Sequence, residues 1–364
     1  MTILIFLAVL VVLILVHEWG HFITAKWTGM RVDEFGIGFP PKLFSWRKGE
    51  TVYSLNALPI GGFVKILGEN GDGDGEVLSV ADQARTFSAR PKWAQAVVLV
   101  AGVTMNILLA WAVLVAILMI GTDVRVGTDS VAPDASLLIL GVVPGSPAAD
   151  LPLKAAILKI SHGEEVLIAP TPESFREFVK AGDGTPVTIT YRAGEVDEVV
   201  TITPERGIDA ANPDIAILGV DTGYLENQRY AFGPAIVEGT KQAAYMLKAI
   251  TVGLVTLLGN AIVGNADFSQ VTGPVGIVEH VGAAAAFGFT SLLYFTAVIS
   301  LNLAVINLLP VPALDGGRLV FVAIEAITKR PINPVWAGRL NLLGFAALML
   351  LMVIVTYNDI VKLF

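Results

Sequence analysis

Residues 3–25 read ILIFLAVLVVLILVHEWGHFITA, an apolar run that carries His17, Glu18 and His21 near its end. A helix of about 20 apolar residues is long enough to cross a bilayer. Each charged side chain at the centre of a bilayer costs about 2.5–3.5 kcal/mol on insertion scales, so such residues are normally kept for a function. The run therefore predicts a membrane-spanning helix that carries a functional site.

The spacing of these three residues is that of a metal site. Residues four apart share one face of a helix, so His17 and His21 can both direct a ring nitrogen at one ion, with Glu18 beside it. The pattern His-Glu-x-x-His is typical of zinc metallopeptidases. The alternative is a set of packing residues that hydrogen-bond neighbouring helices, which would be a costly use of three ionisable groups. We predict a Zn²⁺ site.

Composition places the whole chain in the membrane. Of 364 residues, 54% are hydrophobic, and the mean hydropathy is +0.69. Both values exceed those of ordinary soluble proteins, so the chain is predicted to be a polytopic membrane protein. The net charge is −8 with no basic stripe, which gives no support to nucleic-acid binding. Cysteine is absent, so disulfides and thiolate ligands are excluded and any metal must use His, Asp or Glu.

Four spans are predicted, at 3–25, 94–120, 288–309 and 340–356. The first lacks the basic flank and cleavage site of a signal peptide, so we interpret it as a retained helix. Basic residues collect after the first span and before the last, which predicts that these segments are cytoplasmic. The N-terminus, residues 121–240 and the C-terminus are then extracytoplasmic. The basic residues are Lys26, Arg31, Lys42, Arg47, Lys48, Lys65, Arg85, Arg90, Lys92, Lys329, Arg330 and Arg339.

Asp315 is the candidate for a third zinc ligand, because it is the other conspicuous acidic group in an apolar setting. His17 and His21 lie toward the cytoplasmic end of their helix, so the span at 288–309 must run inward to bring Asp315 to the same depth. A fifth span at 242–263 would reverse that direction. On the condition that Asp315 is a ligand, we predict that 242–263 lies along the membrane interface, with Lys241, Lys248 and Thr251 on one polar stripe.

Residues 122–206 differ in character from the spans. Val187–Tyr191 and Val199–Thr203 alternate around a turn at Ala193–Glu195 and predict a hairpin, while Pro172–Val179 predicts a short amphipathic helix. Gly141–Ala149 resembles the opening of a bacterial PDZ domain, a fold that binds extended chains by strand addition. Leu151–Ala156 departs from the usual turn of that fold, so peptide binding and a purely steric role stay open.

The predicted organisation has four parts. A membrane core covers 1–121, a PDZ-like α+β domain covers 122–206, a linker with an interfacial helix covers 207–284, and a second membrane core covers 285–364. Between the first two spans, 35–41 and 52–67 are apolar, rich in glycine and broken by proline, which predicts membrane-associated hairpin strands. Interfacial loops are the alternative to an edge strand that clamps an extended substrate.

These motifs together resemble the site-2 protease family of intramembrane zinc metalloproteases, and most closely its bacterial regulator-of-sigma-E branch, which carries a PDZ insertion. The resemblance extends over essentially the whole chain. One departure is Val103, where the family commonly has proline. The matching pieces are His17–His21, Gly36–Phe39, Gly102–Asn106, Gln270–Ile277 and Asn302–Gly317, the last of which ends in Leu314-Asp315-Gly316.

The resemblance implies a zinc endopeptidase that cleaves single-span proteins in the bacterial inner membrane after a first cut on the outer side. Its substrates would be of the anti-sigma-factor type or signal-peptide remnants. It implies that Asn307 holds the substrate backbone, and it points to Asn302, Asn106, Gly36 and Gly38 as further substrate-binding positions. A membrane scaffold without turnover and a zinc transporter are the competing classes, and intact Glu18 with all ionisable groups at one site argues against both.

A mechanism follows from three protein ligands, His17, His21 and Asp315, because that number leaves the fourth position of a zinc ion open. The metal acidifies water, and Glu18 is expected to take a proton from that water and return it to the departing amine. Pro310 and Pro312 are predicted to break the helix beside Asp315 and so open room for an unwound substrate. His162 and His280 lack metal-spaced partners and are predicted to be ordinary turn or surface histidines.

Overall fold

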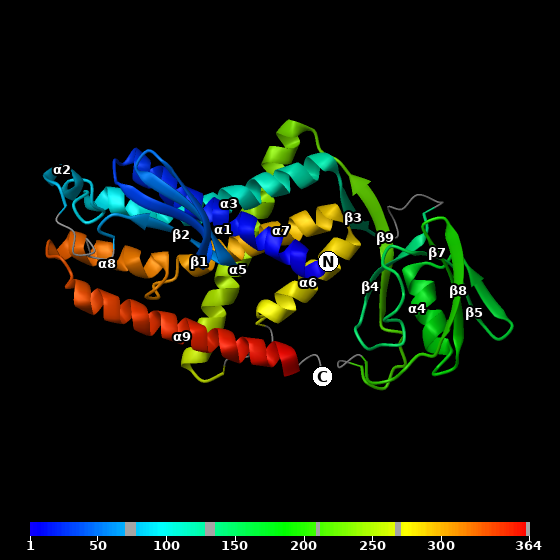
Figure 1. Cartoon of the computed structure of the whole chain (residues 1–364). Helices are drawn as coiled ribbons and strands as arrows, with labels where there is room; N and C mark the ends of the chain where they lie inside the picture. Colours follow the sequence, from blue (N-terminus) through cyan, green and yellow to red (C-terminus); the bar gives the residue numbers. More distant parts are fainter. Residues whose placement is uncertain (70–77, 128–134, 209–211, 266–270, 362–364) are drawn as a thin grey trace. The chain divides into compact units, whose positions relative to one another are not determined.

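A computed structural model describes residues 1–69, 78–127, 135–208, 212–265 and 271–361 (Figure 1). The chain forms two compact units. One unit comprises Met1–Met119 with Ala231–Phe364, and the other comprises Ile120–Tyr230. The first unit holds the long apolar helices and the second is mainly β-sheet.

Within the described residues, five helices are long and apolar enough to cross a membrane. Each of the four predicted spans coincides with one of them, which confirms these segments as apolar helices. The fifth helix contains the segment 242–263. The five are α1 (Thr2–Trp27), α3 (Lys92–Ile120), α5 (Phe232–Ile262), α7 (Phe289–Asn307) and α9 (Pro334–Val361).

Helix α5 begins ten residues before the segment that was predicted to lie along the interface. Lys241, Lys248 and Thr251 are all exposed, as the predicted polar stripe requires. In Figure 1 the axis of α5 runs across those of α1, α3, α7 and α9. Length and composition also permit α5 to span, so the four-span count stays a prediction.

The described residues of this unit also form three shorter helices: α2 (Val80–Gln83), α6 (Pro274–Phe287) and α8 (Asp315–Thr328). The Asp359 carboxylate near the end of α9 accepts the backbone N–H groups of Gly273 and Gly276, so it caps the first turn of α6. Helix α7 ends at Asn307 and α8 starts at Asp315, with Pro310 and Pro312 between them. The predicted helix break beside Asp315 is confirmed.

Strands β1 (Val32–Lys48) and β2 (Thr51–Ile66) confirm the predicted hairpin. Both strands bend, β1 near Gly38 and β2 near Leu58, and the pairing changes there. Residues 32–37 pair on one side with 52–55 and on the other side with 62–66, while 42–48 pair with 51–56. The hairpin is therefore a curled sheet of four segments. Within the described chain, no strand pairs with the outer edge of 62–66.

Two apolar clusters hold the membrane unit together. One joins α1, the hairpin and α3 through Phe22, Phe35 and Val98, with Val322 of α8. The other joins α3, α5 and α7 through Leu114, Ala243, Ala297 and Leu301. The first cluster is the one that connects the motif helix α1 with α8, the helix that begins at Asp315.

Where the structure describes it, the second unit is an antiparallel seven-stranded sheet with one helix, α4 (Pro172–Ala181). The strand order is β3-β9-β4-β5-β7-β8, with β6 paired to β5. The strands are β3 (Thr122–Val126), β4 (Leu137–Val142), β5 (Ala156–His162), β6 (Glu165–Ile168), β7 (Val187–Ala193), β8 (Val196–Ile202) and β9 (Val220–Gln228).

The predicted hairpin and amphipathic helix of this unit are confirmed as β7, β8 and α4. The predicted end of this domain, residue 206, is too early, because the compact unit extends to Tyr230. Strand β9 pairs with both β3 and β4, so residues 207–230 belong to the compact unit rather than to a linker. The strand was not predicted because five of its nine residues are polar or charged: Asp221, Thr222, Glu226, Asn227 and Gln228.

Candidate metal centre

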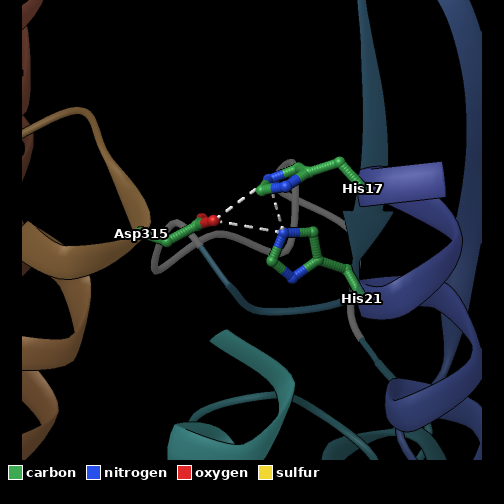
Figure 2. Close-up of side chains that lie close together, drawn as sticks. All are labelled: His17, His21 and Asp315. Atoms are coloured by element: carbon green, nitrogen blue, oxygen red, sulfur yellow. Dashed lines mark hydrogen bonds and ion pairs between the residues drawn. The ribbon is translucent and has the colours of Figure 1, made fainter. Parts of the chain in front are cut away.

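Three side chains converge on one point in the membrane unit (Figure 2). His17 and His21 extend from one face of α1, and Asp315 faces them from the first turn of α8. The Asp315 Oδ2 atom lies 3.2 Å from Nε2 of His17 and 3.2 Å from Nε2 of His21, and the two Nε2 atoms are 3.2 Å apart. Among the described residues, these three form the only such cluster of potential metal ligands.

The triangle of donor atoms fits a tetrahedral zinc ion. Ligands at about 2.0–2.1 Å in a tetrahedron lie about 3.3 Å from one another, close to the 3.2 Å spacings observed. Asp315 Oδ2 is buried and has no conventional hydrogen-bond partner in the described chain. A buried carboxylate oxygen aimed at two imidazole nitrogens is satisfied by a shared cation. The residues present therefore suit Zn²⁺.

A hydrogen bond to the backbone of α3 fixes the orientation of the His21 ring. Its Nδ1 atom lies 2.8 Å from the carbonyl oxygen of Val98, which can only accept a hydrogen bond. Nδ1 therefore carries the proton, and Nε2 is left with its lone pair toward Asp315 and His17. This is the tautomer that a metal ligand requires.

Gly20 of α1 and Gly102 of α3 allow the two helices to approach closely enough for that contact. A Cβ atom on Gly102 would lie 2.4 Å from His21 Nε2 and 2.7 Å from His17 Cε1. A Cβ atom on Gly20 would lie 2.5 Å from the carbonyl oxygen of Ala101. Sequence reasoning noted Gly102 only as part of a motif. Its contact with both histidines is an interhelical feature that spacing along the chain does not reveal.

A tight loop at 308–314 sets the position of Asp315. Cβ atoms on Gly316 and Gly317 would lie 2.3 Å from backbone oxygens of this loop, so both positions need glycine. Helix α9 supports the loop from the other side. Asn341 Oδ1 accepts the backbone N–H of Ala313 at 3.3 Å, and Gly344 packs against Pro312.

Two ion pairs attach α8 to the rest of the unit. Arg318, one turn after Asp315, pairs with Glu69 after the hairpin, and Glu325 pairs with Lys92 of α3 at 2.5 Å. All four side chains line a cavity of about 590 Å³. Because one pair lies at each end of α8, the helix is held in both position and rotation.

Glu18 follows His17 on α1 and lies against the last segment of the hairpin. A Cβ atom on Gly62 would come 3.1 Å from Glu18 Cγ and 2.8 Å from Ile14 Cγ2. The start of the segment 62–66 therefore lies beside the predicted base.

The three asparagines predicted to bind substrate have different surroundings. Asn307 ends α7 and is half-buried at the start of the helix break. Asn302 donates its amide N–H to Val298 O at 2.9 Å, within its own helix. Asn106 is 0% exposed, and its Nδ2 lies 3.2 Å from His17 Nδ1. Its position is behind a metal ligand, which does not favour the predicted contact with substrate.

Gly36 and Gly38, the other predicted substrate positions, are buried inside the hairpin. A Cβ atom on Gly36 would meet the ring of Phe63 at 2.4 Å, and Gly38 has φ +79° with Leu58 O 2.7 Å from its Cβ position. Both glycines are needed for the curled pairing of the sheet. Direct contact with substrate stays a prediction.

His162 and His280 lie apart from the centre. His162 Nε2 lies 2.6 Å from Thr185 Oγ1 in the β-sheet unit. His280 Nδ1 lies 2.6 Å from Gly276 O, and its ring stacks on Phe295. Neither belongs to a metal-ligand cluster of the described residues.

Comparison with known sequences gives one family. The sequence model of peptidase family M50 matches residues 5–351. A protein of Clostridium perfringens, named as a predicted zinc metalloprotease, is 35% identical over 352 residues, which cover 96% of this chain and 95% of that protein.

Other relatives carry the name RasP. Zinc metalloprotease RasP of Geobacillus kaustophilus is 30% identical over 435 residues, with 99% of this chain and 97% of the relative covered. Regulator of sigma-W protease RasP of Bacillus subtilis is 28% identical over 440 residues, with 100% and 99% covered. The matched part of the chain extends over both compact units.

Proposed function

The chain belongs to peptidase family M50, the site-2 proteases, and is a zinc metalloprotease of the membrane; from this premise we propose that it cleaves single-span proteins inside the bilayer. The observation that carries the proposal is the His17–His21–Asp315 triangle, two of whose members lie on the apolar helix α1. A peptidase centre in that helix reaches peptide bonds that soluble enzymes do not.

Glu18 is the general base and acid of the proposed reaction. When bound, Zn²⁺ supplies Lewis acidity, which polarises a peptide carbonyl and makes water easier to deprotonate. The Glu18 carboxylate takes the proton of water as the water oxygen attacks the carbonyl carbon. The same carboxyl then gives the proton to the amine nitrogen that leaves. His17, His21 and Asp315 hold the ion, and the closely packed α3 limits solvent behind it.

A helical substrate has to unwind before its carbonyls can react, because every backbone group in a helix is already paired. The outer edge of residues 62–64, which no strand of the described chain covers, offers replacement partners to an extended chain by strand addition. That edge adjoins Glu18 through Gly62. Asn307, at the end of α7, is proposed to hold the substrate backbone next to the scissile bond, since its amide has both donor and acceptor and no charge.

The substrate class is proposed from the relatives. One of them is named regulator of sigma-W protease. Control of a sigma factor by a membrane protease is consistent with cleavage of an anti-sigma factor that has one span. Signal-peptide remnants present the same chemistry, a single apolar helix without a large outer domain. Both are proposed to need a first cut on the outer side.

Residues 120–230 are proposed to form a PDZ-like domain on the extracytoplasmic side that excludes substrates with bulky outer parts. Helix α4 and residues 215–222 line a groove of about 520 Å³, with Arg176 and Lys180 on the helix side. A groove between a helix and a strand is the geometry used for strand addition. Peptide binding in this groove would add recognition of a trimmed end to the size filter.

The proposed location is the bacterial inner membrane, with the metal centre toward the cytoplasm. Support comes from Lys26, Lys42 and other basic residues around the hairpin, which favour the cytoplasmic side. Four spans with α5 at the interface keep α7 running inward. The crossing direction of α5 in Figure 1 is consistent with that placement.

The test uses purified full-length protein and a tagged single-span substrate, trimmed on its outer side, in detergent or proteoliposomes. Cleavage is measured before zinc removal by a chelator, after removal and after zinc is restored. The proposal expects cleavage within the apolar segment that disappears with the metal and returns with it. Cleavage only outside the span, or cleavage that resists zinc removal, contradicts it.

A further inference from the structure

Asn106 of α3 lies behind His17, on the side away from Asp315. It is 0% exposed, and the closest approach joins Asn106 Nδ2 to His17 Nδ1 at 3.2 Å. Ser300 of α7 donates its hydroxyl to the backbone oxygen of Asn106 at 2.8 Å, which ties this turn of α3 to α7. The side chain is therefore fixed in place beside a metal ligand.

The hydrogen-bond roles in this contact follow from the other ring nitrogen. His17 Nε2 points at Asp315 and His21, so it needs its lone pair free to bind an ion. A neutral imidazole that ligates through Nε2 carries its proton on Nδ1. Nδ1–H is a donor, and it cannot pair with the amide nitrogen of Asn106, which is also a donor.

A second observation points the same way. Asn106 Oδ1 is buried and has no hydrogen-bond partner among the residues that the structure describes. The oxygen and nitrogen of an asparagine amide have nearly the same shape, and their assignment is decided by the hydrogen-bond network. Rotating the amide by half a turn brings Oδ1 to His17 Nδ1. One rotation removes a donor–donor clash and satisfies a buried acceptor.

We propose that Asn106 is a positioning residue for zinc, whose Oδ1 accepts the Nδ1–H of His17 and holds the ring with Nε2 toward the metal. This role rests on the proposed ligand set of the metal centre. Both histidines then donate Nδ1–H to an acceptor on α3, because Val98 O accepts the Nδ1–H of His21. Helix α3 contributes no ligand, yet it sets the tautomer of both imidazoles.

Groups that hydrogen-bond a metal-bound histidine change metal affinity by about 10- to 100-fold when they are removed. Asn106→Leu keeps a similar size and removes the acceptor, so zinc affinity should fall by about 10- to 100-fold. Asn106→Asp keeps an acceptor at the same place, and its zinc affinity should match or exceed that of the wild type. The order expected is Asp at least equal to Asn, and both well above Leu.

The measurement is zinc affinity of the purified full-length protein by competition with a chromophoric chelator. Thr104→Ala, two residues away on an exposed face of α3, is the matched control and should leave the affinity unchanged. Thermal melting of the metal-free variants checks that the helices are packed. Equal affinities of the wild type and the Leu variant overturn the proposal.

The Asp variant keeps the proposal testable if the Leu variant does not fold. A tenfold or larger loss of affinity in Asn106→Asp means that the amide donates to His17 instead, and it overturns the assignment. His17→Ala separates this result from failure of the metal centre itself. If His17→Ala abolishes zinc binding while Asn106→Leu does not alter it, the ligand set stands and only the role of Asn106 falls.

Discussion

At the scale of single residues, the metal centre depends on a glycine, Gly102, as much as on its ligands. Gly102 lies against both imidazoles, and any Cβ at this position would overlap His21 Nε2. The backbone of α3 cannot move away easily, because Gly20 brings α1 just as close to Ala101. The histidines would have to rotate, and they would lose the spacing that fits zinc.

We therefore expect Gly102→Ala to lower zinc affinity by at least about tenfold, as for loss of a supporting group around a ligand. The matched control is Gly253→Ala in α5, where nothing lies within 4 Å of the Cβ position. Chelator competition on both purified variants measures the effect. Equal affinities in the two variants would contradict the packing described for Gly102.

Glu50 gives a prediction for acid stability at the turn of the hairpin. It accepts two hydrogen bonds from Arg85 at 2.8 Å and one from Lys26 at 2.5 Å. The Arg85 guanidinium, with Lys26, lowers the pKa of Glu50 to about 2 from the ordinary 4.5. A carboxylate with a depressed folded-state pKa stabilises the fold above pH 4.5, and this stabilisation is lost as pH falls toward 2.

Glu50→Gln should thus reduce thermal stability at pH 7, by about 1 kcal/mol at most because the group is one-third exposed and solvent screens it. The deficit relative to the wild type should stay constant down to about pH 5 and shrink below pH 4.5. Melting in detergent across this range measures it. A deficit that grows as the pH falls would have the wrong sign.

At the scale of elements, the position of α8 decides whether Asp315 meets the histidines. Charge pairs at both ends fix this helix, Arg318 with Glu69 and Glu325 with Lys92. Partly exposed pairs of this kind contribute up to about 1 kcal/mol each. That is enough to change the population of correctly placed Asp315 by about fivefold.

Lys92→Glu should reduce the rate of substrate cleavage by a few-fold, up to about fivefold, through misplacement of α8. Adding Glu325→Lys should restore part of the rate, since Glu325 also accepts the backbone N–H of Ile332 and that bond is not recovered. Lys241→Glu, which breaks an exposed ion pair with Glu238 on α5, is the control and should not change the rate of cleavage. A double variant that cleaves more slowly than Lys92→Glu alone would argue against the role of these charge pairs in placing α8.

The sequence predicted most helices of the membrane unit but missed strand β9 of the second unit. The length of apolar runs predicted α1, α3, α7 and α9, and the placement of proline and glycine predicted the helix break before Asp315 and the strands of the hairpin. The β9 strand was missed because its polar side chains hide a pairing with β3 and β4 that only the fold creates. Asp315 was found as an acidic group in an apolar setting, but Val98, Gly102 and Asn106 act across a helix interface, which a linear spacing does not encode.

At the scale of the whole molecule, the second unit is expected to select substrates by outer size. A substrate with a short outer stump should be cleaved, whereas the same span fused to a folded outer domain should be cleaved at least about tenfold more slowly. The variant Arg176→Glu, in the groove beside α4, distinguishes size exclusion from peptide binding. Exclusion predicts normal cleavage of the short substrate by this variant, and recognition of a trimmed end predicts a loss. Equal cleavage of both substrates by the wild type would contradict the filter.

The central claim is that zinc held by His17, His21 and Asp315 works with Glu18 on a peptide bond in the membrane. The most direct measurement compares purified wild type with Glu18→Gln, recording both zinc content and cleavage of a trimmed single-span substrate. We predict equal zinc in the two proteins and cleavage by the wild type alone. Cleavage by Glu18→Gln at a rate near that of the wild type, with zinc present in both, would contradict the account.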